Sequence, residues 1–83
     1  MKVTVKYFAS IREAIGQGSE SLDTSACDLA ALRDELIARG PSFADALARG
    51  KAVRLALNQV MVSESTALTD GCEVAFFPPV TGG

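Results

Sequence analysis

The sequence predicts an α+β domain in which one main helix packs across a mixed sheet of four or five strands. Short segments that alternate apolar and polar residues, or are apolar throughout, lie near both ends of the chain and between residues 52 and 62. Leucines at helical spacing fill the segment 28–40. With 83 residues, of which 48% are hydrophobic, the chain forms one small core and is not disordered.

The first predicted strand covers residues 2–8, and its apolar side carries Val3, Val5 and Tyr7. One or two helical turns follow in residues 10–16, since Ser10 and Glu13 have the spacing of a capping box and Gly16 ends the pattern. A turn at the glycines 16 and 18 then leads into a short second strand that ends near Leu22.

The main helix is predicted over residues 28–40, and its apolar face carries Leu29, Leu32, Leu36 and Ile37. Either Ser25 or Asp28 can cap its start, and the sequence does not separate them. Glu35 and Arg39 are spaced to form an ion pair along the helix.

Gly40-Pro41 is predicted to end the main helix, with a left-handed glycine cap and a proline that cannot continue it. Residues 42–50 form another short helical turn, and residues 52–62 a strand with a bend at Asn58-Gln59. The last strand, residues 72–77, is apolar on both faces, which is typical of a central strand or of one that meets a partner. One face holds Val74 and Phe76, and the other holds Ala75 and Phe77.

The charge balance argues against nucleic acid and membrane surfaces as partners. The net charge is −2, and no cluster of lysines and arginines occurs in the sequence. No signal peptide and no apolar run long enough to span a bilayer is visible, so we expect a cytoplasmic protein.

The chain is also poorly equipped as an independent catalyst. It has no histidine, which removes the usual zinc sites and the Ser-His and Cys-His dyads. Cys27 and Cys72 lack metal-ligand spacing, and we expect both to be reduced and partly buried. The acidic residues are scattered and serve as caps, turns or solvated faces, so we expect no metal site.

The segment "PPVTGG", residues 78–83, is the strongest candidate for a functional site. Two prolines favour a stiff extended conformation, and six residues reach roughly 20 Å. Gly82 and Gly83 place no β-carbon beside the terminal carboxylate, so this end can enter a narrow channel in another protein. We therefore expect a folded domain in residues 1–77 and a flexible tail in 78–83, although the tail alone is equally compatible with an idle disordered end.

The whole chain resembles the small, sulfur-carrying subunits of molybdopterin synthase, a family of ubiquitin-like β-grasp proteins. The resemblance is carried by "KYFASIRE", "ALRDEL", "ALNQVMV" and above all "LTDGCEVAFFPPVTGG" at the end of the chain. A Gly-Gly end is a weak signal by itself, whereas this complete final segment in a chain of about 80 residues is highly specific.

The resemblance implies that an E1-like enzyme uses ATP to adenylate the Gly83 carboxylate, and that a sulfur donor then converts the adenylate into a thiocarboxylate. The loaded tail would enter the large subunit of the synthase, in a heterotetramer, and give its sulfur to cyclic pyranopterin monophosphate. It further implies that the chain holds no permanently bound cofactor and is a sulfur-donating subunit, because the catalytic side chains belong to the large subunit.

The resemblance also assigns roles to individual residues. Gly83 carries the sulfur, while Gly82 and Thr81 give the tail access to the partner's channel. The residues expected to meet the partner are Phe76, Phe77, Pro78, Pro79, Val80 and Arg12. Phe77 is equally compatible with a place in the core, and Arg12 with a solvated helix end. Relatives often have Asp or Asn where this chain has Cys72, and the roles of Cys27 and Cys72 stay open.

Three other functions are compatible with parts of this pattern. A sulfur carrier for thiamine synthesis would share the fold and the Gly-Gly end, although such carriers tend to lack "FFPPVTGG". A ubiquitin-like protein modifier would join Gly83 to lysines from the same adenylate. A plain binding module would use its apolar sheet face and would not need Gly82 and Gly83.

Overall fold

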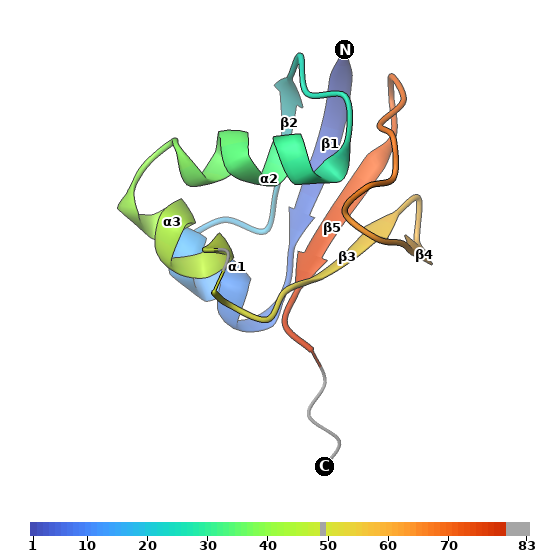
Figure 1. Cartoon of the computed structure of the whole chain (residues 1–83). Coiled ribbons are helices and arrows are strands. Elements are labelled where there is room, and N and C mark those ends of the chain that lie inside the picture. Colours follow the sequence, from blue (N-terminus) through green and yellow to red (C-terminus); the bar gives the residue numbers. More distant parts are fainter. Residues whose placement is uncertain (49, 80–83) are drawn as a thin grey trace.

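The computed structural model describes residues 1–48 and 50–79 and shows helices packed on one face of a five-stranded sheet (Figure 1). The sheet has the order β2-β1-β5-β3-β4. The strands are β1 (Lys2–Tyr7), β2 (Ser19–Asp23), β3 (Arg54–Leu57), β4 (Val60–Met61) and β5 (Glu73–Phe77). The helices are α1 (Ala9–Ile15), α2 (Leu29–Ile37) and α3 (Pro41–Leu47). None of the helices in the described part of the chain is long and apolar enough to cross a membrane.

The sheet is mixed, as the sequence predicts. Strand β5 lies at its centre, parallel to β1 on one side and antiparallel to β3 on the other. Strands β2 and β4 are antiparallel to β1 and β3 and form the two edges. The interpretation of the last strand as central is therefore confirmed. One of its apolar faces, with Val74 and Phe76, packs in the core, and the other, with Ala75 and Phe77, lies on the side away from the helices.

One hydrophobic core lies between the sheet and the helices. The alternation in β1 is confirmed, because Val3, Val5 and Tyr7 are buried. Helix α2 lies across the sheet in Figure 1 and turns its leucine face inward, with Leu29, Leu32 and Leu36 completely buried. At roughly 2 kcal/mol for each fully buried leucine, this face is a main source of the domain's stability.

Helix α1 begins differently from the prediction. Its N-cap is Phe8, which makes no side-chain capping bond, and Ser10 already lies inside the helix, so the predicted capping box is wrong. The strand runs directly into the helix, and the Phe8 carbonyl accepts hydrogen bonds from Ile11 and Arg12 N–H at 3.1 and 3.2 Å. Gly16 ends the helix as predicted, in a left-handed conformation with φ of 90°.

Asp28, one of the two predicted candidates, caps helix α2, since its Oδ1 accepts a hydrogen bond from Ala31 N–H at 2.8 Å. The predicted Glu35–Arg39 ion pair is wrong. The helix ends at Ile37, so Arg39 does not continue the helical face, and its Nη1 lies 2.8 Å from Glu20 Oε1.

Gly40 and Pro41 start the next helix instead of capping α2. The C-cap of α2 is Ala38 in a right-handed conformation, so the predicted left-handed glycine cap is wrong. Gly40 is the N-cap of α3 and Pro41 is its first residue. Proline suits this position because its fixed φ is helical and the missing N–H would have no partner there.

The predicted bend at Asn58-Gln59 is a complete reversal of the chain. It forms a two-residue hairpin between β3 and β4, in which Leu57 pairs with Val60. Both turn residues have positive φ, 50° and 70°, as tight hairpin turns require. Asn58 also exchanges hydrogen bonds with Glu73, at 2.8 and 2.9 Å, which ties the hairpin to β5.

Gln59→Gly is expected to stabilise the domain by about 0.5–1 kcal/mol, because glycine adopts positive φ without the steric cost that glutamine has there. Urea unfolding followed by circular dichroism measures the difference. Gln17→Gly is a control at an exposed residue that is not among the positive-φ residues of the described chain, and it is not expected to stabilise. An unchanged or lower midpoint for Gln59→Gly would count against a strained turn.

Candidate functional site

The tail leaves the sheet from its centre. Strand β5 ends at Phe77, and Pro78 and Pro79 follow, both partly buried. Because proline has no N–H to donate, the strand ladder cannot continue past them. In Figure 1 the described chain leaves the sheet beside α1 and the start of β3. The predicted residues Val80, Thr81, Gly82 and Gly83 lie outside the described residues.

The two aromatic residues at the end of β5 face opposite sides of the sheet. Phe76 is 0% exposed and packs in the core against Tyr7, with ring centroids 6.2 Å apart. The structure therefore places the predicted partner residue Phe76 where its side chain cannot touch another protein directly, because strand alternation turns it inward. Phe77 lies on the outer face, partly exposed, and its position there fits a partner contact better than a core role.

Phe8 joins Phe77 beside the tail and is missing from the sequence prediction. The two rings meet edge to face with centroids 6.4 Å apart, and Phe8 is 46% exposed. The Phe8 N–H donates to the Phe76 carbonyl at 3.1 Å, which fixes Phe8 to the end of β5. The available signal was the alternation of β1, which turns the residue after Tyr7 to the outer side.

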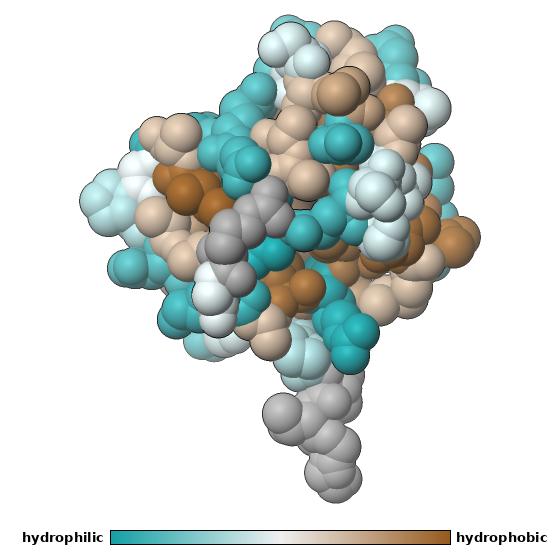
Figure 2. All heavy atoms as spheres, in the orientation of Figure 1, coloured by the Kyte–Doolittle hydropathy of each residue, from teal (hydrophilic) through white to brown (hydrophobic). Residues whose placement is uncertain are grey.

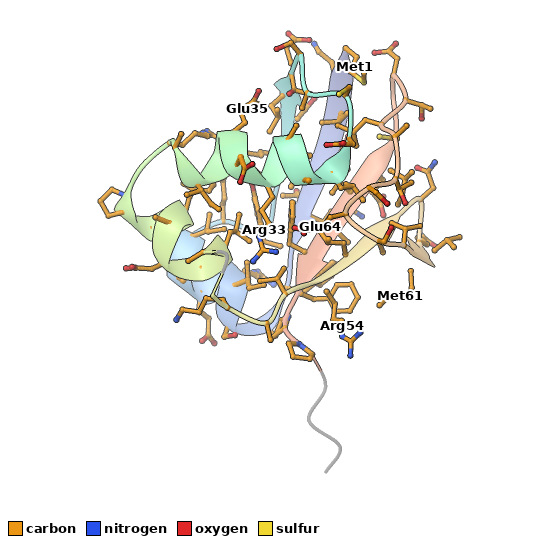
Figure 3. All side chains as sticks on the ribbon, viewed as in Figure 1. Met1, Arg33, Glu35, Arg54, Met61 and Glu64 are labelled. Atoms are coloured by element: carbon orange, nitrogen blue, oxygen red, sulfur yellow. The ribbon has the colours of Figure 1, made fainter. Side chains whose placement is uncertain are left out.

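The outer face of the sheet carries an apolar surface that reaches the base of the tail. Ala56 and Ala75 are register partners at its centre, and Met61 lies opposite Ala56. Met61 is 55% exposed. Figure 3 shows Met61 on the side of the sheet away from the helices, and Figure 2 shows exposed hydrophobic surface where β4 lies. We call this surface the outer patch, formed by Phe8, Ala56, Met61, Ala75 and Phe77.

Ala56 and Ala75 at the centre of the outer patch are themselves buried, so its accessible part consists of exposed Phe8 and Met61 and partly exposed Phe77. Exposed aromatic and methionine side chains gathered on one face are a candidate site of protein contact. Because Phe77 is the last residue before the prolines, a protein that holds the tail also comes near the patch.

Arg12 lies away from the base of the tail. Its side chain is exposed and covers Gly18, where an added β-carbon would be 3.2 Å from Arg12 Nε. The residues of α1 that face Pro78 are Ser10, Ile11 and Ala14. The structure does not place Arg12 with the other predicted partner residues, and its contact with a partner stays a prediction.

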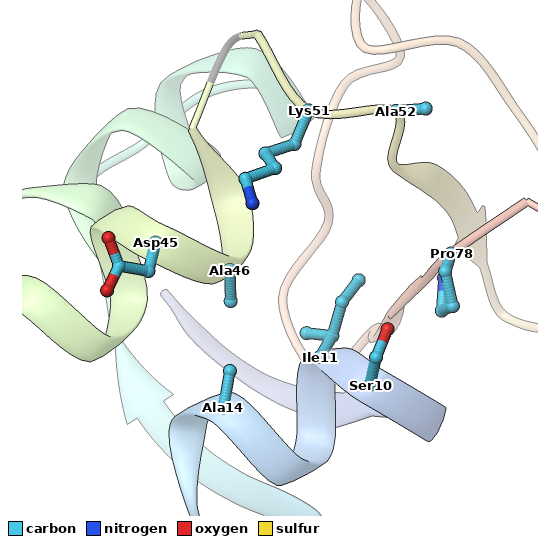
Figure 4. Close-up of a pocket in the computed structure, with 8 residues that line it drawn as sticks. All are labelled: Ser10, Ile11, Ala14, Asp45, Ala46, Lys51, Ala52 and Pro78. Carbon is cyan, nitrogen blue, oxygen red and sulfur yellow. The ribbon is translucent and has the colours of Figure 1, made fainter.

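A recess of about 190 Å³ lies beside Pro78 (Figure 4). Helices α1 and α3 and the segment Lys51–Ala52 line it, and Figure 4 shows the Lys51 side chain extending along it toward α3. Asp45, Lys51 and Ser10 add a carboxylate, an ammonium group and a hydroxyl to a wall that is otherwise apolar. Its size suits a single side chain rather than a nucleotide or another cofactor.

Buried Arg33 holds the wall of this recess in place. It extends from α2 and is 5% exposed. Its guanidinium donates to the carbonyls of Leu47, Ala48 and Lys51 at 2.7, 2.8 and 3.3 Å. It also forms an ion pair with Glu64 at 2.9 Å, and Figure 3 shows the two side chains next to each other between α2 and β3. One side chain thus satisfies the end of α3 and fixes the chain that leads into β3.

The Tyr7 side chain contacts residues of both β5 and β2. Its ring packs against Phe76, and its hydroxyl donates to Glu20 Oε2 at 2.7 Å. Glu20 also pairs with Arg39. Burial raises the pKa of Tyr7 well above its usual range, and the hydrogen bond to the Glu20 carboxylate and its negative charge act in the same direction.

Stability is expected to fall above pH about 10, the ordinary pKa of an unfolded tyrosine. The folded state keeps Tyr7 protonated, so its contribution is complete below that pH and decreases as the unfolded chain ionises. Because Tyr7 is the single tyrosine and the chain lacks tryptophan, ultraviolet absorbance reports its ionisation directly. The absorbance of tyrosinate should increase only as the domain unfolds. Ionisation of Tyr7 near pH 10 in a protein that is still folded would contradict the prediction that burial and the bond to Glu20 keep Tyr7 protonated.

The sheet order, the helix across one face and the central last strand define the ubiquitin-like β-grasp class. The structure of SAMP1 from Haloferax volcanii superposes with a TM-score of 0.80 over 100% of both chains, at 24% identity, and supports the fold. The β-grasp prediction is confirmed, with α1 and α3 as the additional short helices.

The model of the ThiS family matches residues 5–83. The molybdopterin synthase sulfur carrier subunit of Escherichia coli K12 is 43% identical over 81 residues, which cover 98% of this chain and 99% of that protein. In a solved complex of subunits 1 and 2 of the molybdopterin-converting factor from Helicobacter pylori, one chain is 28% identical, with a TM-score of 0.70 and complete coverage of both chains. The chain belongs to the ThiS family and, within it, to the molybdopterin synthase sulfur carrier subunits.

Proposed function

We propose that this molybdopterin synthase sulfur carrier subunit carries its sulfur as a thiocarboxylate on Gly83 and delivers it in molybdenum cofactor biosynthesis. The structural observation that supports the proposal is the place where the tail leaves the sheet. A central strand ends at two prolines, beside exposed Phe8 and partly exposed Phe77. The root of the tail is thus held by a rigid sheet, and the surface around it suits a protein that encloses the tail.

The first step activates the carboxylate, because its oxygen is a very poor leaving group. A Gly83 oxygen attacks the α-phosphorus of ATP in an E1-like enzyme, which forms the acyl adenylate and releases pyrophosphate. A nucleophilic sulfur at the oxidation level of sulfide then attacks the carbonyl carbon, the carbon–oxygen bond to AMP breaks, and AMP leaves with the bonding electron pair, so that the sulfur remains on the glycine as a thiocarboxylate. ATP is consumed by the activating enzyme, and the carrier holds no resident cofactor.

The loaded tail then enters the large subunit of the synthase, where its sulfur passes to cyclic pyranopterin monophosphate. Each carrier delivers one sulfur, so a dithiolene needs two deliveries, and we propose a heterotetramer of two small and two large subunits. The catalytic side chains come from the large subunit. Because the pathway uses ATP, we place the carrier in the cytoplasm.

Intact-mass spectrometry tests the proposal directly. The chain is incubated with its activating enzyme, ATP and a sulfur source, and a matched sample uses a chain that lacks Gly83. A mass gain equal to the replacement of one oxygen by sulfur, absent from the shortened chain, is expected. Absence of both the gain and an adenylate would overturn the proposal, and conjugates on many target proteins would favour a protein modifier instead.

A further inference from the structure

Arg54 stands beside the tail on the outer face of the sheet. It is the first residue of β3, it is exposed, and its register partner is Phe77, the last residue of β5. Its neighbour Leu55 points into the core, so strand alternation turns Arg54 outward together with Ala56. Figure 3 shows Arg54 near the end of β5, on the same side of the sheet as Met61.

Arg54 forms no ion pair with the described residues of the domain. The other cation near the middle of this face, Lys6, lies 3.4 Å from Glu73. Among residues 1–48 and 50–79, none of the ion pairs within 4.0 Å involves Arg54. Its neighbours across and along the strands are Phe77 and Ala56. Arg54 therefore places a positive charge among apolar neighbours beside the tail, on a chain whose net charge is −2.

We propose that Arg54 pairs with a carboxylate of the large synthase subunit and thereby sets the orientation in which the outer patch docks. This inference rests on the proposed function, in which that subunit encloses the tail. Such a partner must approach the corner where Phe77 and Pro78 lie. Arginine binds a carboxylate through two parallel hydrogen bonds, which fixes direction as well as distance. Covering the outer patch removes water from around the pair, which strengthens it.

The test measures the affinity of the full chain for the purified large subunit, by calorimetry, at low and at high salt. Arg54→Glu is expected to weaken binding by about 100-fold, since it replaces attraction by like-charge repulsion. Arg54→Met, which keeps most of the apolar stem, should weaken binding by about tenfold and reduce the salt dependence. Lys2→Glu makes the same charge change on the same face at the far end of β1 and should change affinity by less than about threefold.

Several outcomes would overturn the proposal. Equal losses for Arg54→Glu and Lys2→Glu would show a general charge effect, and unchanged binding of Arg54→Met would show that no specific pair forms. A loss confined to sulfur loading by the activating enzyme would assign Arg54 to that other partner. Urea midpoints of all variants separate a binding loss from unfolding.

The same samples keep this inference distinct from the proposed function. If the unaltered chain gains sulfur and binds the large subunit, and the Arg54 variants do so equally well, only the role of Arg54 fails. If the unaltered chain neither gains sulfur nor binds the large subunit, the proposed function fails and the Arg54 pair fails with it.

Discussion

Removal of Gly83, or addition of one residue after it, is expected to abolish molybdopterin formation. The reaction takes place at the terminal carboxylate, and one residue shifts that group by roughly 3.5 Å. Misplacement of a reacting group by about 1 Å can already cost about 100-fold in rate, so the loss should exceed that. The assay combines activating enzyme, large subunit, ATP, sulfur source and cyclic pyranopterin monophosphate, and measures the dithiolene product.

The control for this prediction is Thr69→Ser, a conservative change at an exposed threonine outside the tail, which should retain near-normal activity. Urea unfolding of each variant establishes that the domain is intact. Full activity from an extended chain, shown by intact mass to be unprocessed after the assay, would contradict the role of Gly83 and leave the plain binding module as the better explanation.

Arg33→Met is expected to destabilise the domain by about 3 kcal/mol, the largest effect we expect from a single polar substitution here. The change removes the donors for three carbonyls at the end of α3 and in the following segment, and it leaves Glu64 without this cation. Methionine restores much of the apolar volume, so the loss reports the hydrogen bonds rather than a cavity.

Urea unfolding, followed by circular dichroism or by the fluorescence of Tyr7, measures this loss. Arg39→Met is the matched control, because the Arg39 side chain is 43% exposed and also joins one carboxylate, so it should cost no more than about 1 kcal/mol. If the two variants lost similar amounts of unfolding free energy, burial would not make the hydrogen bonds of Arg33 more stabilising than the exposed contact of Arg39. A large loss should also weaken binding to the large subunit, since the segment that Arg33 holds runs into β3 and Arg54.

Much of the fold can be predicted from local patterns. The alternation in β1, the leucine face of α2 and the double-sided apolar pattern of β5 each depend on burial, and burial selects residue types directly. The predicted helix ends were less accurate. Ser10, Gly40 and Arg39 each had a local role that fits the sequence, and tertiary neighbours decided otherwise.

The sequence by itself determined the class of fold and the family, because residue order carries periodicity and the terminal motif directly. Only the tertiary structure decided which residues surround the tail. Phe8, Arg54 and Phe77 come from separate segments, and strand register brings them together on one face while it turns Phe76 inward. Register and side depend on pairing between distant strands, which a local pattern does not contain.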